Sequence, residues 1–261
     1  MKAVVSIAGS DSSGGAGIQA DIKTIAAHHL YAETVITALT AQNTLGVTGV
    51  HEVPAAFVSE QIDAVFSDIR PDAVKIGMVS SAEIIRAIAA GLDRWHAENI
   101  VVDPVMVATS GARLIGEDAI SALVEELLPR ASVITPNIPE AQVLCGRELS
   151  DEQSCERAAL ALAQSLGVDV LVKGGHGTHD ANDVLATQEG AIHWFRHEAI
   201  ATSNTHGTGC TLSSAIACGL ACGLAVPEAV SAAKEYLTGA LSAGLDLGQG
   251  SGPLDHMWQN A

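Results

Sequence analysis

The sequence predicts an α/β protein of three layers, in which helices cover both faces of a doubly wound, mostly parallel central sheet. Short apolar runs alternate with longer segments of 3.6-residue periodicity along the whole chain, as in parallel strands joined by crossover helices. The composition of 48% hydrophobic residues, 25 glycines and only 3% aromatic residues suits small aliphatic strands under Ala-rich helices. Since no linker or repeat interrupts the pattern, we expect a single domain over residues 1–261.

The individual elements follow from this pattern in chain order. We expect parallel strands at residues 3–7, 34–39, 73–76, 100–102, 132–135 and 169–172. We expect helices at residues 18–28, 55–67, 82–96, 118–128, 156–166, 209–223 and 227–244, the last one opened by Pro227. Residues 182–201 alternate β-branched and aromatic side chains with polar ones, which predicts antiparallel edge strands. We expect residues 184–186 of that edge to be the seam of a dimer.

Charge and cysteine usage exclude several classes of protein. The net charge of -17 repels phosphate backbones and anionic lipids, and no basic patch offsets it, so we expect no nucleic acid and no membrane as partners. Residues 1–7 lack the apolar stretch of a signal peptide, which predicts a cytoplasmic protein. The five cysteines are too irregularly spaced for a disulfide framework, and none form a Cys-x-x-Cys metal pair.

Residues that directly follow the predicted strands are the first candidates for a binding site. Ligands of open parallel sheets bind outside the carboxyl ends of the strands. Glycine, amide, acidic and lysine residues gather at these positions, together with two apolar ones: Gly9, Gln42, Asp103, Asn137, Glu140 and Lys173, with Met78 and Val105. We therefore expect a small, polar ligand at this edge of the sheet.

The glycine-rich loop at residues 9–17 fits neither of two common nucleotide motifs. A P-loop needs Lys and then Ser or Thr after its second glycine, where this chain has Gly15 and Ala16. A dinucleotide fingerprint needs an acidic residue at the end of the next strand, where residues 40–42 are Thr, Ala and Gln. What remains is a loop that lets backbone approach a ligand, with Asp21 about one turn into the following helix. An ordinary tight turn explains the segment nearly as well.

Residues 204–214 carry the strongest local signal in the chain. Gly207 and Gly209 precede Cys210, which opens an apolar helix. Free amides at a helix N-terminus point at one spot, which predicts an anion hole for a transferred phosphoryl group. There Cys210 could be a thiolate base or could orient an acceptor hydroxyl, although a lone cysteine is otherwise a small core residue.

Together these segments resemble the ribokinase superfamily and, within it, the hydroxymethylpyrimidine/phosphomethylpyrimidine kinases of thiamin biosynthesis. The similarity covers nearly the whole chain and includes residues 7–21, 37–44, 75–78, 102–106, 135–140, 172–176, 205–210 and 250–253. Most members of the superfamily carry aspartate where this chain has Cys210, whereas cysteine is usual in the pyrimidine kinase branch. The resemblance therefore implies a ribokinase-like fold and a kinase of that branch.

The resemblance also implies cofactors, substrates and the roles of individual residues. The cofactors would be ATP and Mg²⁺, the substrates hydroxymethylpyrimidine and then its monophosphate, and the assembly a homodimer. Catalytic positions would be Gly207, Thr208, Gly209, Cys210 and Lys173, and the nucleotide would be bound by Asn137, Lys173 and Thr205. Mg²⁺ would lie near Asp103 and Glu140, although either acid could instead cap a helix and Lys173 could pair only with a carboxylate. The pyrimidine would be bound by Gln42, Asp21, Gly9, Met78 and Val105.

Gln42 favours one substrate class over its nearest rival. Its amide donates and accepts side by side, which matches the edge of an aminopyrimidine but not of a pyridine. Related vitamin B6 kinases can share Cys210 but usually lack the run at residues 40–43. The alternatives are a pyridoxal or pyridoxine kinase, and a non-catalytic ligand-binding relative, which should lack the anion hole.

Overall fold

The strands form one sheet whose spatial order departs from the order of the chain. The computed structural model describes residues 1–106, 116–175 and 181–260, and within them nine strands pair in the order β3-β2-β1-β4-β5-β6-β7-β8-β9. The strands are β1 (Ala3–Asp11), β2 (Tyr31–Asn43), β3 (Gly46–Glu52), β4 (Ala73–Ile76), β5 (Ile100–Val102), β6 (Val133–Ile134), β7 (Asp169–Val172), β8 (Asp183–Ala186) and β9 (Ile192–Phe195). Strands β2, β1, β4, β5, β6 and β7 are parallel, whereas β3, β8 and β9 pair antiparallel.

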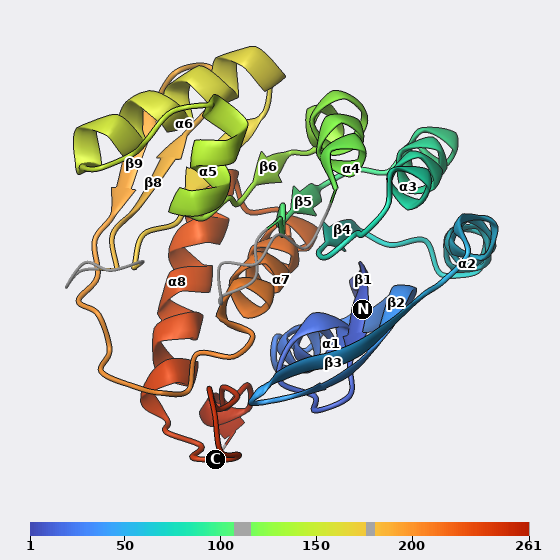
Figure 1. Cartoon of the computed structure of the whole chain (residues 1–261), viewed down its shortest axis with the longest axis horizontal. Helices are drawn as coiled ribbons and strands as arrows, with labels where there is room; N and C mark the ends of the chain where they lie inside the picture. The colour runs from blue at the N-terminus through green and yellow to red at the C-terminus, as the bar shows by residue number, and fades with distance from the viewer. Residues whose placement is uncertain (107–115, 176–180, 261) are drawn as a thin grey trace.

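Helices cover both faces of this sheet (Figure 1). One face carries α1 (Gly17–Ala27), α7 (Thr208–Ala221) and α8 (Val226–Ser242). The other carries α2 (Ala55–Asp68), α3 (Ala82–Trp95), α4 (Glu117–Ala122), α5 (Ile138–Cys145) and α6 (Glu152–Leu166). Successive strand residues point to opposite faces, so Val4 and Val101 pack in the core under α7 and α8, while Val5 and Val102 pack in the core under α2 and α3. The predicted three-layer, mostly parallel fold is confirmed.

Several boundaries differ from the prediction for identifiable physical reasons. Strand β3 was missed because all of its residues are exposed, so it shows no alternation of apolar and polar positions. Helix α5 was missed because it has only eight residues, and α6 begins four residues early because Asp151 caps it. The helix expected at residues 118–128 is α4 followed by a π turn and a 3₁₀ turn that contains Pro129.

The expected dimer seam at residues 184–186 is wrong in one respect. Strand β8 is not an edge strand, because it lies between β7 and β9 and all four of its residues are buried. The edges of the sheet are β3 and β9. Any contact between copies through a strand edge would therefore involve one of those two strands.

The strand order creates the crevice where a ligand of such a sheet is expected. From β1 the chain first moves to β2 on one side, and it later returns to β4 on the other side of β1. The carboxyl ends of all six parallel strands lie at one edge, and the order reverses between β1 and β4, which is where doubly wound sheets bind ligands.

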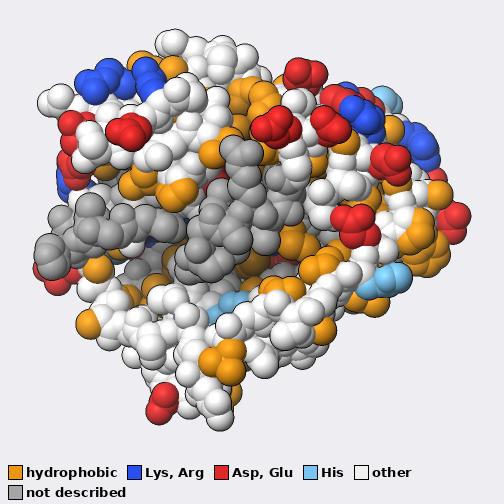
Figure 2. Space-filling view, viewed as in Figure 1, with side chains coloured by type: hydrophobic (Ala, Val, Ile, Leu, Met, Phe, Trp, Pro, Cys, Tyr) orange, Lys and Arg blue, Asp and Glu red, His pale blue; other side chains and the backbone are white. Residues whose placement is uncertain are grey.

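The surface agrees with the acidic composition. On the face seen in Figure 2, charged side chains gather mainly in the upper half, over α3 to α6. Far fewer lie in the lower half, around β3 and the C-terminal segment.

Among the described residues, none of the helices combines the length and apolar character needed to cross a bilayer.

Candidate active site

The N-terminus of α7 lies directly against the glycine loop that follows β1. Gly207 caps this helix with φ +88°, a left-handed conformation that favours glycine. A Cβ added to Gly207 would overlap the carbonyl oxygen of Gly15 and lie 3.3 Å from the Cα of Ala16. The hydroxyl of Thr208 donates to the Thr205 carbonyl at 2.7 Å and so holds the turn before the helix. The two glycine segments therefore pack directly on each other, and Gly207 cannot carry a side chain without displacing the backbone at Gly15.

An ion pair at the ends of β5 and β7 borders this helix N-terminus. Lys173 Nζ lies 2.6 Å from Asp103 Oδ1, which also accepts a hydrogen bond from the Thr135 hydroxyl at 3.1 Å. A Cβ added to Gly209 would lie 3.1 Å from Asp103 Oδ2 and 3.4 Å from Lys173 Nζ. The structure thus brings Gly209, Lys173 and Asp103 together. An ammonium group and the free amides of α7 face one spot, which is the arrangement that binds phosphate.

Glu140 adds a second carboxylate near Asp103. It is 2% exposed and forms a capping box with Asn137. The backbone N–H of Asn137 donates to Glu140 Oε2 at 2.9 Å. Burial raises the pKa of the Glu140 carboxyl to about 7, an effect that Lys173 opposes and Asp103 increases. The capping role that the sequence left open is therefore real for Glu140 and Asn137, and it leaves two carboxylates near one lysine.

This charge balance suits a divalent cation. Two carboxylates against one ammonium leave an excess of negative charge when both carboxylates are ionised. Within the described parts of the chain, no group of three or more His, Cys, Asp or Glu is placed to hold a metal. Mg²⁺ commonly uses one or two carboxylates together with water and phosphate oxygens, so Asp103 and Glu140 fit it.

Cys210 is half-buried in the first turn of α7, and its surroundings favour the neutral thiol. Burial raises the pKa of the Cys210 thiol to about 11. Lys75 and the Gly17 amide oppose that rise, while Asp21 and Asp103 add to it. The helix N-terminus, which by itself lowers the pKa of a thiol, does not outweigh burial here. The raised pKa therefore argues against a thiolate base.

Asp21 does not occupy the position expected of a ring contact. It is 0% exposed, and both of its oxygens lie within 2.9 Å of the equally buried Lys75 ammonium. The hydroxyls of Ser6 and Ser214 donate to the same carboxylate at 2.5 and 2.8 Å. The distance of one helical turn between Gly17 and Asp21 could not reveal that Ser6, Lys75 and Ser214, from β1, β4 and α7, surround this carboxylate. Asp21 is therefore a buried counter-ion beneath Cys210 rather than an exposed substrate contact.

The expected ring contacts lie at the ends of β1, β2, β4 and β5. A Cβ added to Gly9 would lie 2.7 Å from Met78 Cε, so the missing side chain of Gly9 leaves room for Met78. The Thr37 hydroxyl donates to the Met78 carbonyl at 3.0 Å, and half-buried Val105 follows Asp103 with its amide bonded to the Asp103 carbonyl at 2.8 Å.

Gln42 is tied to the glycine loop from both ends of its backbone. The backbone N–H of Gln42 donates to the Ser12 hydroxyl at 2.9 Å, and that hydroxyl donates to the backbone carbonyl of Gln42 at 2.8 Å. The Gln42 side chain is half-buried, between Thr40 and His206.

The position of His176, in the run similar to the family, lies outside the described residues.

Sequence reasoning missed Asp11 and His206, which link these segments. Asp11 accepts hydrogen bonds from the amides of Ser13, Gly15 and Ala16 at 2.8, 3.1 and 2.8 Å, and its Oδ2 lies 2.8 Å from His206 Nε2. Burial tends to raise the pKa of the Asp11 carboxyl, but the hydrogen bonds from His206, Ser13 and Ala16 hold it well below its usual range. The available signal was that both residues lie in the two glycine-containing segments, residues 9–17 and 204–214, that the sequence singled out.

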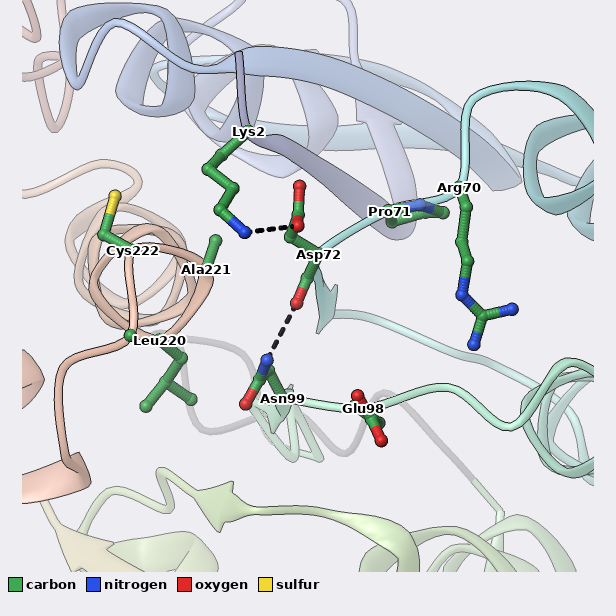
Figure 3. Close-up of a pocket in the computed structure, with 10 residues that line it drawn as sticks. Lys2, Arg70, Pro71, Asp72, Glu98, Asn99, Leu220, Ala221 and Cys222 are labelled. Atoms are coloured by element: carbon green, nitrogen blue, oxygen red, sulfur yellow. Dashed lines mark hydrogen bonds and ion pairs between the residues drawn. The ribbon is translucent and has the colours of Figure 1, made fainter.

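A separate hollow lies at the opposite end of the strands (Figure 3). Its lining includes the ion pair of Lys2 and Asp72 at 2.7 Å and the last turn of α7 up to Cys222. Helix α7 has 14 residues and begins at Thr208. At a rise of about 1.5 Å per residue, the hollow is roughly 20 Å from the anion site. It is not part of the cluster around Lys173.

Comparison with known proteins identifies the family. A sequence model of the family described as phosphomethylpyrimidine kinase matches residues 11–255. The chain belongs to this family. The hydroxymethylpyrimidine/phosphomethylpyrimidine kinase of Rhizobium meliloti is 55% identical over 256 residues, which cover 97% of this chain and 96% of that protein. The thiamine biosynthesis bifunctional protein ThiED of Geobacter sulfurreducens is 52% identical over 97% of this chain, and the chain spans 52% of that longer protein.

A solved structure extends the comparison to the fold. The Bacillus subtilis pyridoxal kinase in complex with ADP superposes with a TM-score of 0.90 at 36% sequence identity, over 100% of this chain and 99% of that chain. The ribokinase-like fold is confirmed. The phosphomethylpyrimidine kinase family thus shares its backbone closely with a pyridoxal kinase, so the backbone alone does not choose the acceptor.

Proposed function

We propose that the protein uses ATP to phosphorylate 4-amino-5-hydroxymethyl-2-methylpyrimidine, here called the aminopyrimidine alcohol, and then converts the monophosphate to the pyrophosphate for thiamin. One observation carries this proposal: the amides at the start of α7 adjoin Lys173 and Asp103 at the sheet edge that also holds Gln42. One crevice therefore offers an anion site for phosphate and a paired donor and acceptor for the ring. The names of relatives 52% and 55% identical support the same reaction.

The phosphate end would act by positioning and by charge stabilisation. The hydroxymethyl oxygen attacks the γ-phosphorus in line, the bond from that phosphorus to the β–γ bridging oxygen breaks, and ADP leaves. The backbone amides of Gly207, Gly209 and Cys210 and the Lys173 ammonium donate to the equatorial oxygens of the transferring group. Asn137 and Thr205 border this site and would contact the nucleotide. Mg²⁺, held by Asp103 and Glu140, would supply neutralisation of the phosphate charge.

Cys210 would orient the acceptor rather than remove its proton. With a pKa of about 11 the thiol is neutral at physiological pH, so it can hydrogen-bond the acceptor hydroxyl but is a poor base. The loose transition state of phosphoryl transfer builds little negative charge on the attacking oxygen, so it makes little demand for an early proton transfer. The hydroxyl proton then passes to a phosphoryl oxygen or to solvent.

The ring end would select the acceptor. The Gln42 amide pairs with the ring nitrogen and exocyclic amino group of the aminopyrimidine, and Met78 and Val105 supply apolar contacts. Gln42→Met keeps the side-chain length but removes both hydrogen bonds. We expect it to lower kcat/KM for the aminopyrimidine alcohol by about 100-fold, since two hydrogen bonds of about 1.4 kcal/mol each are lost. Unchanged turnover of this alcohol by the variant would refute the ring assignment.

The assay that tests the function measures ADP release from ATP and Mg²⁺ with the aminopyrimidine alcohol, pyridoxal and ribose in parallel. We expect the aminopyrimidine alcohol to give the highest kcat/KM and its monophosphate to be a second acceptor. A pyridoxal kinase is the competing function, because the Bacillus subtilis pyridoxal kinase has a closely similar backbone, with a TM-score of 0.90. Higher kcat/KM for pyridoxal would establish that competitor.

The cellular setting and assembly belong to the same proposal. All five cysteines, Cys145, Cys155, Cys210, Cys218 and Cys222, are free, as expected of a protein in the reducing cytoplasm. We propose a homodimer, supported by exposed Leu45, Val47 and Val50 on the hairpin that ends in edge strand β3. Sedimentation velocity of the purified chain would distinguish dimer from monomer.

A further inference from the structure

We propose that His206 is a positioning residue that sets which way the Gln42 amide faces, and thereby makes the site selective for an aminopyrimidine edge. This inference rests on the proposed function, because it assigns the origin of selectivity at the same site. It is carried by the contacts among His206, Asp11, Gln42 and Thr40.

His206 joins three segments that are distant in sequence. Its side chain is 17% exposed, and its Nε2 lies 2.8 Å from Asp11 Oδ2 and 3.5 Å from the terminal amide of Gln42. Its backbone amide donates to the Gly252 carbonyl at 3.0 Å, and it forms a parallel bridge with Pro253. The imidazole is therefore held between the loop after β1, the end of β2 and the C-terminal segment.

Asp11 determines the proton on the imidazole. Its carboxylate already accepts from the amides of Ser13, Gly15 and Ala16, so its position is fixed by the backbone of the loop. An ionised carboxylate can only accept hydrogen bonds. His206 Nε2 must therefore carry a proton, which it donates to Asp11 at 2.8 Å. The same N–H lies 3.5 Å from the Gln42 carboxamide, and as the weaker branch of a three-centre contact it favours the carboxamide oxygen over the nitrogen on that side.

Thr40 fixes the other end of the Gln42 amide. Its hydroxyl oxygen lies 2.9 Å from the Ser10 carbonyl oxygen and 2.9 Å from the Gln42 carboxamide, but it has a single proton. The Ser10 carbonyl can only accept, so the proton goes there and the Thr40 oxygen accepts from the Gln42 NH₂ group. The structure sets Gln42 Oε1 toward Thr40 and Nε2 toward His206. Nitrogen and oxygen of a carboxamide are assigned from their partners, and these partners require the reverse, with the nitrogen facing Thr40 and the oxygen facing His206. The opposite assignment would set two donors, from His206 and Gln42, against each other.

This orientation leaves Gln42 one free N–H and one free lone pair in a defined order. An aminopyrimidine can pair with them through its ring nitrogen and its exocyclic amino group, whereas a pyridine lacks that paired edge. Without the donor of His206, the amide can rotate by 180° and offer the pair in reverse order. His206 would then act on selectivity without touching the acceptor.

The test compares two acceptors that differ in one group: the aminopyrimidine alcohol and 5-hydroxymethyl-2-methylpyrimidine, which lacks the amino group. We expect His206→Phe, which keeps a planar ring without the donor, to lower kcat/KM for the amino substrate by about tenfold, mainly through KM. The analogue should change by less than about twofold, because it makes only part of the paired contact. His206→Gln, which restores an N–H near the position of Nε2, should recover most of the selectivity.

Two further variants keep the test decisive. Thr40→Val removes the acceptor at the other end of the amide and should cause the same loss of selectivity, even if His206→Phe does not fold. His193→Phe, on the exposed side of β9, is the matched control and should leave both acceptors unchanged.

The outcomes separate this inference from the proposed function. In both His206→Phe and Thr40→Val, kcat/KM could fall equally for the two acceptors, or the ratio of the two values could stay that of the wild type. Either result would overturn the role of His206 and leave the proposed function intact. A wild-type protein that prefers pyridoxal to the aminopyrimidine alcohol would overturn the proposed function and this inference with it. Selective loss in the variants and recovery in His206→Gln would support both.

Discussion

The two ends of the proposed site would bind their ligands through different kinds of group. The phosphate end consists of backbone amides at the start of α7 and the ion pair of Lys173 and Asp103, set by strands and a helix. The ring end consists of side chains, chiefly Gln42, held through His206 and Asp11 from separate parts of the chain. Backbone amides recognise any phosphate, while side chains distinguish rings. Changes at the phosphate end should therefore affect every acceptor alike, and changes at the ring end should alter their ranking.

The largest effect should come from Gly207→Ala. The added Cβ would overlap the Gly15 carbonyl oxygen and force α7 away from the loop, which misaligns the amides of the anion site. Since one lost oxyanion donor costs about 10² to 10³ in kcat, we expect at least a 10³-fold fall with every acceptor, measured by ADP release.

Gly223→Ala is the matched control for that variant. Gly223 has the same φ of +88° as Gly207, but a Cβ added there meets nothing within 4 Å. Both variants bear the strain of a left-handed alanine, about 1–2 kcal/mol, and only Gly207→Ala should lose activity. Comparable kcat in the two variants would show that the close approach to Gly15 has no catalytic importance.

Lys173→Met should have the next largest effect and should not alter selectivity. We expect kcat/KM to fall about 100-fold and by the same factor for the aminopyrimidine alcohol and its desamino analogue, because the proposed ligand of Lys173 is the phosphate. Lys234→Met is the control for stability, since Lys234 forms another buried lysine pair, 2.8 Å from Asp183. Both variants should lower the melting temperature, because each leaves a carboxylate unpaired. A change in acceptor ranking in Lys173→Met would contradict the division of the site.

Cys210→Ser should have a smaller effect, of about tenfold on kcat, because a hydroxyl can still orient the acceptor. The pKa of about 11 keeps the Cys210 thiol protonated from pH 6 to 9, so no step in kcat over that range should depend on it. The profile of kcat against pH should therefore have the same shape in wild type and variant. An alkaline rise in wild type that disappears in Cys210→Ser would instead indicate a thiolate base.

Glu33→Gln should leave activity unchanged and alter only stability. Burial, together with Asp68, raises the pKa of the Glu33 carboxyl from 4.5 to about 7, and among the described residues its Oε2 is buried without a hydrogen-bond partner. The folded state keeps this proton to higher pH than the unfolded state, so wild-type stability falls as pH rises from about 4.5 to 7. The variant should lack that fall.

The measurement for Glu33 is urea unfolding at pH 5 and pH 8. At pH 8 we expect Glu33→Gln to be more stable than wild type by on the order of 1–2 kcal/mol, and at pH 5 the difference should nearly vanish. Glu60→Gln, on the exposed side of α2, is the control and should match wild type at both values. Equal stability of wild type and Glu33→Gln at pH 8 would mean that the buried carboxylate carries no penalty.

The sequence predicts local features of the site and fold better than contacts between distant segments. Gly207, Gly209 and Cys210 are readable because a glycine turn before an apolar helix is encoded within a few residues. Strand ends place Lys173 and Asp103 at one edge as soon as the sheet is known to be parallel. The exposed strand β3 has no hydrophobic periodicity and so could not be recognised.

The residues that were missed or misplaced depend on partners far away in the chain. Asp21 is covered by Lys75 from β4 and by Ser214 from α7, which no spacing within residues 9–21 reveals. His206 meets Asp11 across 195 positions, and Gln42 across 164. Such contacts decide whether a polar side chain faces a ligand or a buried partner, and only the three-dimensional arrangement shows them.

The most direct test of the account is a crystal structure with ADP, Mg²⁺, aluminium fluoride and the aminopyrimidine alcohol, since the fluoride complex mimics the transferring phosphoryl group. We expect fluoride ligands at about 3 Å from the backbone amides of Gly207, Gly209 and Cys210 and from Lys173 Nζ, with the hydroxymethyl oxygen in line on the opposite side. A phosphoryl mimic bound away from the start of α7, with Lys173 still paired only to Asp103, would contradict it.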